Sequence, residues 1–169
     1  MNHLFKIFVL FSLLMMTIFS CKKDDLYGDV VVDSQLHEKL YLNVEDTIKI
    51  DNQNLVLQTE LYRDFFPGVT KINTRLFAPI YIVNIDSLLI SKKFEIKTLY
   101  VINKEQIWIS TPNPVEDNIM PIYKVFRIST NGPEWETDIY VDVVVVIEDL
   151  STGKINYLIA RNQLITKLE

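Results

Sequence analysis

The stretch that decides the fold is Ile139-Tyr140-Val141-Asp142-Val143-Val144-Val145-Val146-Ile147, a run dominated by β-branched residues. Because side chains alternate between the two faces of a strand, the odd-numbered residues from Ile139 to Ile147 form one continuous apolar face. The other face is polar toward its ends but carries Val144 and Val146 at its middle. The pattern therefore predicts a strand that is central in its sheet or covered on both sides.

Shorter alternating or apolar runs lie on either side of this strand. They predict further strands over 55–61, 80–83, 94–102, 107–110, 122–128 and 155–158. Residues that favour turns separate them, at Pro67-Gly68, Thr111-Pro112-Asn113-Pro114, Asn131-Gly132-Pro133 and Ser151-Thr152-Gly153. We expect 149–154 to be the loop of a hairpin.

This succession of short strands predicts a mainly β fold. The best match is an antiparallel β-sandwich, immunoglobulin-like or transthyretin-like, and a small antiparallel β-barrel is the alternative. Residues 30–50 carry a weaker pattern. Within them, Asp33-Ser34 can cap a short helical turn that places Leu36 and Leu40 on one side.

The N-terminus has the three parts of a secretory signal. A short positive start with Lys6 is followed by the apolar run Ile7 to Phe19 and by the small residue Ser20. The run has thirteen residues, whereas a helix needs roughly 20 apolar residues to span a bilayer. Residues 1–20 are therefore expected to be a cleaved signal peptide rather than an uncleaved anchor.

The residues Ile18-Phe19-Ser20-Cys21 resemble the lipobox of bacterial lipoproteins. Ser20 matches the small residue before cleavage and Ile18 the aliphatic residue, while Phe19 stands where the commonest pattern has a small or hydroxyl residue. The resemblance implies that Cys21 is acylated through a thioether-linked diacylglycerol and becomes the first residue of the mature chain. Cys21 is also the only cysteine, so no internal disulfide competes for it.

The residues that follow, Lys22-Lys23-Asp24-Asp25, look like the surface-export signal of Bacteroidota-type lipoproteins. By that resemblance Lys23 is the signal lysine, and Asp24 and Asp25 are the acidic pair. It implies an outer-membrane protein, lipid-anchored and facing the cell surface, with a periplasm-facing position as the alternative. Both resemblances end at residue 25. They divide the chain into the signal peptide (1–20), an acylated cysteine with a charged tether (21–29) and a single β-sandwich domain (30–169).

The charge balance excludes one class of partner. Removing residues 1–20 takes one of 17 basic residues, Lys6, and none of 22 acidic ones, which leaves a net charge of −6. Nucleic acid is not expected as a partner, because phosphate binding needs clustered Lys and Arg and the basic residues here are scattered. Contact with the membrane is expected through the N-terminal lipid.

Catalytic and metal-binding patterns are not found. His37 is the only histidine after residue 20, and no Gly-x-Ser-x-Gly elbow or glycine-rich phosphate loop occurs. Asp51-Asn52-Gln53-Asn54 is expected to be a polar turn rather than a calcium loop. The acids around Trp135 are expected to be solvated decoration of a strand. We therefore predict no enzyme activity, no cofactor and no metal.

Exposed aromatic residues are the better candidates for binding. Trp108 shares a face with Gln106 and Ser110, opposite Ile107 and Ile109, so it is expected to be exposed, whereas Trp135 has the parity of the core. Phe65 and Phe66 are adjacent before a turn, and neighbours in a strand point in opposite directions. Trp108, Phe65 and Phe66 are thus the candidate ligand-binding residues.

These observations predict a lipid-anchored protein of the cell envelope that acts as a non-enzymatic binding or assembly accessory for a glycan or an envelope protein. A structural or adhesive subunit of a surface assembly is the first alternative, because the apolar residues Leu158, Leu164 and Ile165 permit an exposed or detachable terminal strand. An envelope hydrolase is the second.

Overall fold

The computed structural model describes residues 29–66, 74–115 and 120–169. The described part is mainly β with one short helix, as the sequence predicts. Its elements are β1 (Asp29–Val32), α2 (Ser34–Asn43), β2 (Val44–Glu45), β3 (Ile48–Ile50), β4 (Gln53–Thr59), β5 (Leu61–Asp64), β6 (Leu76–Asn84), β7 (Phe94–Asn103), β8 (Gln106–Ser110), β9 (Asn113–Pro114), β10 (Lys124–Ser129), β11 (Tyr140–Asp149) and β12 (Ile155–Leu168).

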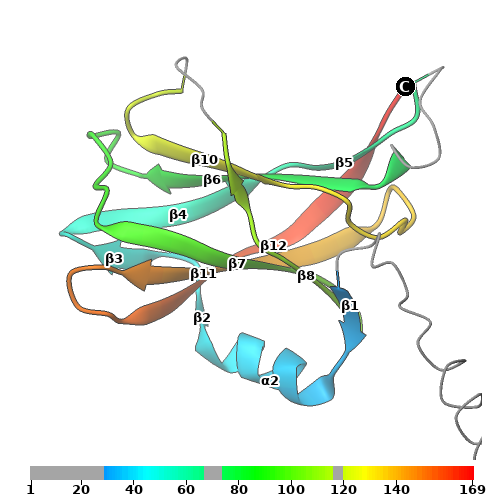
Figure 1. The fold of residues 1–169 in the computed structure, drawn as a ribbon, viewed down its shortest axis with the longest axis horizontal. Coiled ribbons are helices and arrows are strands. Elements are labelled where there is room, and N and C mark those ends of the chain that lie inside the picture. Colours follow the sequence, from blue (N-terminus) through cyan, green and yellow to red (C-terminus); the bar gives the residue numbers. More distant parts are fainter. Residues whose placement is uncertain (1–28, 67–73, 116–119) are drawn as a thin grey trace, which may run out of the picture.

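The strands form one large mixed sheet that curls into a half-barrel (Figure 1). Its order is β1-β8-β7-β11-β12-β5-β6-β10-β9, and β3 and β4 extend it through β6. In Figure 1, β4, β6 and β10 lie in one layer, and β7, β8 and β11 in the other. The predicted valine-rich strand is β11, which lies between β7 and β12 and is therefore central, as expected.

The long strand β12 joins the two layers. Its first part pairs with β11, and its last residues, Ile165–Leu168, pair with β5. The sequence indicates a strand only over 155–158, because the polar residues Arg161, Asn162 and Gln163 interrupt the alternation. The structure continues the strand past them through an irregularity in the register. Most strand pairs are antiparallel, but β12 pairs in parallel with both β2 and β5, so the sheet is mixed rather than purely antiparallel.

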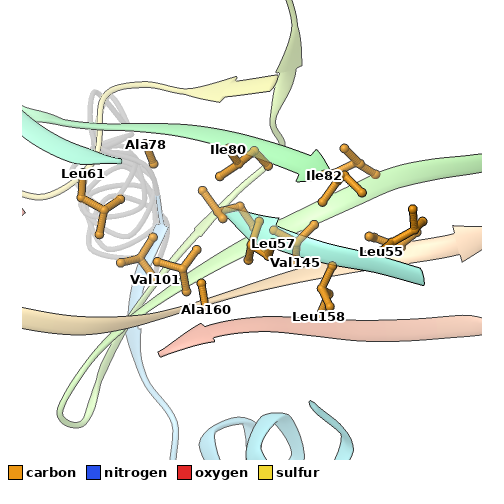
Figure 2. Close-up of a cluster of buried hydrophobic side chains, with 14 of the residues drawn as sticks. Leu55, Leu57, Leu61, Ala78, Ile80, Ile82, Val101, Val145, Leu158 and Ala160 are labelled. Carbon is orange, nitrogen blue, oxygen red and sulfur yellow. The ribbon is translucent and has the colours of Figure 1, made fainter. Parts of the chain in front are cut away.

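The main core lies between the two layers (Figure 2). Alternate residues of β4 and β6 face alternate residues of β7, β11 and β12, as the parity of the strands requires. Residues that meet there include Leu55, Leu57, Ile80, Ile82, Val101, Val145, Leu158 and Ala160.

The helix α2 covers the outer face of the β7–β8–β11–β12 layer. The predicted cap is confirmed, since the Asp33 carboxylate accepts hydrogen bonds of 2.9 Å from the backbone N–H groups of Gln35 and Leu36. Leu40 is 1% exposed and belongs to a second apolar cluster with Ile102, Ile107, Val144 and Ile159. The helix thus gives Val144 a buried environment on the face of β11 that points away from the main core.

Two predicted turns are confirmed. Asp51 and Asn52 both have positive φ and join β3 to β4, as in the two-residue hairpins that favour Asp and Asn. The loop at 149–154 joins β11 to β12, and Gly153 in it has a φ of 72°. Asp149 accepts hydrogen bonds there from Ser151 N and Thr152 Oγ1, both of 2.8 Å, and these bonds hold the pKa of its carboxyl below the usual range.

Candidate binding surface

Trp108 is not a surface residue, so its prediction as an exposed ligand-binding side chain is wrong. It is 0% exposed and belongs to the main core, and its indole Nε1 has no hydrogen-bond partner within the described part of the chain. Trp108 and Ile107 lie on opposite faces of β8, as predicted, but both faces of the strand are covered. Ile107 lies in the cluster beneath α2, while Trp108 faces the other layer.

Phe65 and Phe66 diverge, as expected for neighbours in an extended chain. Phe65 is half-buried, and the Arg63 guanidinium and the Lys167 amine lie 4.9 and 5.3 Å from its ring centroid. Its backbone N–H donates to the carbonyl of Leu168 over 2.8 Å. Phe66 is 48% exposed. The turn predicted at Pro67-Gly68 lies outside the described residues.

The sites predicted in the N-terminal segment also lie outside the described residues. They are Cys21 for lipid attachment and Lys23, Asp24 and Asp25 for export. His37, on α2, is half-buried with its ring centroid 4.8 Å from that of Tyr41.

An aromatic surface with a cavity is formed by Trp135 and Tyr140, neither of which is predicted from the sequence to bind a ligand. The segment between β10 and β11 carries Trp135, and backbone hydrogen bonds from Gly132 N to Leu76 O (3.0 Å) and from Asp138 N to Ile165 O (2.8 Å) fix its two ends. Arg63 Nη1 donates to the carbonyl of Trp135 over 2.7 Å. This segment is therefore anchored to β5, β6 and the end of β12 despite its lack of regular structure.

The Trp135 ring is held on the β7–β8 hairpin. Its Nε1 donates a 2.7 Å hydrogen bond to Oε1 of Gln106, and the ring is partly buried against the main core. Tyr140 at the start of β11 is 67% exposed. A fixed indole beside an exposed phenol gives a rigid apolar surface with a polar edge, the arrangement that aromatic recognition sites use.

A cavity of about 530 Å³ lies at these two side chains. This volume is in the range of small-ligand sites. Its lining combines the aromatic rings with groups that donate or accept hydrogen bonds: Asn103, Lys104, Glu134, Trp135, Glu136, Ile139 and Tyr140. Glu134 and Glu136 are both exposed, as expected for solvated acids, although the segment that carries them is irregular rather than a strand, and both line this cavity.

This arrangement suits a ligand that has both apolar faces and many hydroxyl groups. Carboxylate oxygens of Glu134 and Glu136 accept hydrogen bonds, the Lys104 amine donates them, and the Asn103 amide does both. No group of three or more His, Cys, Asp or Glu side chains that could hold a metal ion occurs among the described residues. Parity alone could not find the site, because the segment 130–139 is irregular and alternation does not apply to it.

The chain matches no protein-family model, and neither a curated protein nor a solved structure is detectably similar to it. Within the part of the chain that the structure describes, no helix is long and apolar enough to cross a membrane.

Proposed function

We propose that the protein is a lipid-anchored component of the outer cell envelope that faces the cell surface and binds a glycan without catalysis. The anchoring part of the proposal rests on Ser20-Cys21 after an apolar run and on the charged residues Lys23, Asp24 and Asp25. The first strand, β1, begins at Asp29. Only seven residues separate Cys21 from it, so the folded domain stays close to the membrane that holds the lipid.

The observation that carries the ligand class is the cavity beside Trp135 and Tyr140. Sugar rings present C–H faces that pack on aromatic rings and hydroxyl groups that bond to carboxylates and amides. The Glu134 and Glu136 carboxylates and the Asn103 amide border the same cavity. A protein ligand is the alternative occupant.

We also propose a specific type for the β fold. The two layers share one core, which supports a sandwich of immunoglobulin-like or transthyretin-like type with one side left open. The parallel pairing of β12 with β5 is an addition to either type.

One observation favours the adhesive alternative. The C-terminal strand expected to be exposed or detachable is instead paired with β11 and β5, and its Leu158 and Ile165 are buried. The strand β1, however, pairs with β8 at the edge of the sheet, and its residues Val30 and Val32 are exposed. A short edge strand next to a tether is an element that a partner's strand can replace. Adhesion by strand exchange at β1 would not use the Trp135–Tyr140 cavity. Substitutions in that cavity therefore distinguish glycan binding from adhesion.

The test is a glycan array probed with the purified full chain and with two variants. Tyr140→Ala removes the exposed ring of the cavity, whereas Phe66→Ala removes an exposed ring elsewhere and is the matched control. The proposal expects a wild-type glycan signal that Tyr140→Ala lowers about tenfold, equivalent to about 1.4 kcal/mol, and that Phe66→Ala leaves unchanged. No glycan signal for the wild type, or equal loss in both variants, would overturn it.

A further inference from the structure

A second cavity, of about 410 Å³, lies on the open side of the half-barrel between β7 and β10. On this side both strands lack a neighbour over part of their length. The strand β8 pairs with β7 only from Leu99 onward, and β9 pairs with β10 only at Arg127 and Ile128. The two layers therefore do not close here among the described residues, and the space between them opens to the surface.

The lining of this cavity is apolar with positive charge. Phe94, Ile96 and Val125 extend from the main core, and Val115 and Met120 border the same space. The polar remainder consists of Ser91, Lys92, Lys124 and Arg127, so no carboxylate of a described residue lines the cavity. Residues 116–119 lie outside the described part and are not included in the site.

Arg127 is the cation best placed to bind an anion. It has the parity of Val125, which packs on the core, and of Ser129, which is buried, so its side chain starts toward the space between the layers. Its Nη1 donates to the carbonyl of Phe126 over 2.8 Å. None of the salt bridges between described residues involves Arg127, although guanidinium groups near apolar surroundings usually pair with a carboxylate.

The two lysines contribute differently. Lys92 is exposed at the rim. The Lys124 amine lies 3.2 Å from Oε1 of Gln58 and 5.5 Å from the centroid of the Tyr81 ring. Lys124 therefore adds positive potential to the cavity while its amine contacts side chains of β4 and β6, and Arg127 is the group available for direct contact.

We propose that this cavity binds a small amphiphile with one carboxylate head and an apolar chain, with the carboxylate at Arg127 and the chain along Ile96 and Val125. The positive charge of Lys92, Lys124 and Arg127, with no carboxylate in the described lining, selects an anion, and the apolar side chains of Ile96 and Val125 offer a surface for its chain. The cavity volume is in the range for small ligands, and the open side lets the end of a longer chain reach solvent. The site is separate from the Trp135–Tyr140 cavity and does not depend on the glycan proposal.

The test uses the full chain held in phosphatidylcholine nanodiscs and decanoate labelled with ¹³C at its carboxyl carbon. A saturable, protein-bound signal at one equivalent is expected, distinct from decanoate dissolved in the disc. Decanol and decylamine, which lack the negative head, should fail to displace it. Arg127→Gln should weaken binding about ten- to a hundredfold, and Arg161→Gln, an arginine of β12 outside the cavity, should leave it unchanged.

A fold readout accompanies each variant, because loss of binding by an unfolded protein would carry no information. The Met120 methyl signal, which reports on the cavity wall, should shift on adding decanoate to the wild type and to Arg161→Gln only. Equal affinity for decanoate and decanol, or unchanged affinity in folded Arg127→Gln, would overturn the proposal. So would binding to phosphatidylglycerol vesicles without binding to decanoate, since the occupant would then be a bilayer lipid.

Discussion

The hydroxyl of Tyr41 on α2 donates a 2.6 Å hydrogen bond to Oδ2 of Asp142 on β11, 101 residues along the chain. The other carboxylate oxygen of Asp142 accepts a 2.8 Å bond from the backbone N–H of Asn162, at the irregularity of β12. One carboxylate thus holds the helix and two strands together. Burial, and then the bond to Asp142, raise the pKa of Tyr41.

The first prediction concerns this contact. Tyr41→Phe should lower the free energy of unfolding by about 1 to 3 kcal/mol, because a part-buried hydrogen bond to a charged acceptor is lost. Urea denaturation followed by circular dichroism measures it. Tyr140→Phe, whose side chain is exposed, is the matched control and should change stability by less than about 0.5 kcal/mol. Equal effects in the two variants would show that α2 is held by its apolar face alone.

The second prediction concerns Gly132, which is a packing glycine rather than a turn glycine. A Cβ there would lie 2.9 Å from Cβ of Leu76 and from two atoms of the Trp108 ring. Gly132→Ala should therefore destabilise the protein by about 1 to 3 kcal/mol through overpacking, measured as a fall in the urea midpoint.

Gly153→Ala is the comparison for that experiment. Nothing lies within 4 Å of an added Cβ at Gly153, but its φ is 72°, so the cost there is backbone strain of about 1 to 2 kcal/mol. The two substitutions separate when each is combined with Trp108→Leu. The smaller leucine side chain at position 108 should restore part of the stability lost in Gly132→Ala and none of that lost in Gly153→Ala. If it restores stability in neither variant, the packing explanation is contradicted.

The strands were predictable where one physical signal dominated. The alternation in β4 and β11 and the Asp33 cap of α2 could be recognised from neighbouring residues alone. The burial of Trp108 could not, because the residues that cover its ring come from distant segments such as Gly132 and the main core, while α2 covers only Ile107 on the opposite face of β8. The same limit applies to β12 and β5, whose parallel pairing joins distant segments, and to the Trp135–Tyr140 cavity, which an irregular segment and a hairpin form together.

The third prediction is a pH dependence in the β11–β12 hairpin. Because the pKa of folded Asp149 lies below its ordinary value of 3.8, the ionised carboxylate stabilises the folded loop above that value, and the stabilisation is lost as the pH falls through the folded pKa. Carboxyl-carbon NMR should give a midpoint below 3.8, and exchange of the Ser151 amide proton should gain protection as Asp149 ionises. In Asp149→Asn this pH-dependent change in the protection of the Ser151 amide proton should be absent. A midpoint above 3.8 would contradict the hydrogen bonds described for this loop.

The fourth prediction is that Cys21 carries the lipid and is the mature N-terminus. Metabolic labelling with a fatty-acid analogue should mark the wild type, and Cys21→Ala should abolish both the label and membrane association, because the chain has no other cysteine to form the thioether. Ser20→Ala keeps a small residue before the cysteine and is the control that should still be labelled. Labelled, membrane-bound Cys21→Ala protein would show that the lipoprotein interpretation is wrong.

The fifth prediction concerns sorting, and it separates the role of the charged residues after Cys21 from that of the lipid. Replacing Lys23, Asp24 and Asp25 with alanine should leave acylation intact, since the lipobox residues precede them, while lowering antibody labelling and protease accessibility on whole cells. A lysed-cell sample distinguishes lost export from lost expression. Lys22→Ala changes a charge in the same segment outside the proposed signal, so it should keep surface labelling near the wild-type level. Equal labelling of wild type and triple variant would show that these residues are only a solvated tether. The periplasm-facing alternative would then have to be tested by the same whole-cell labelling.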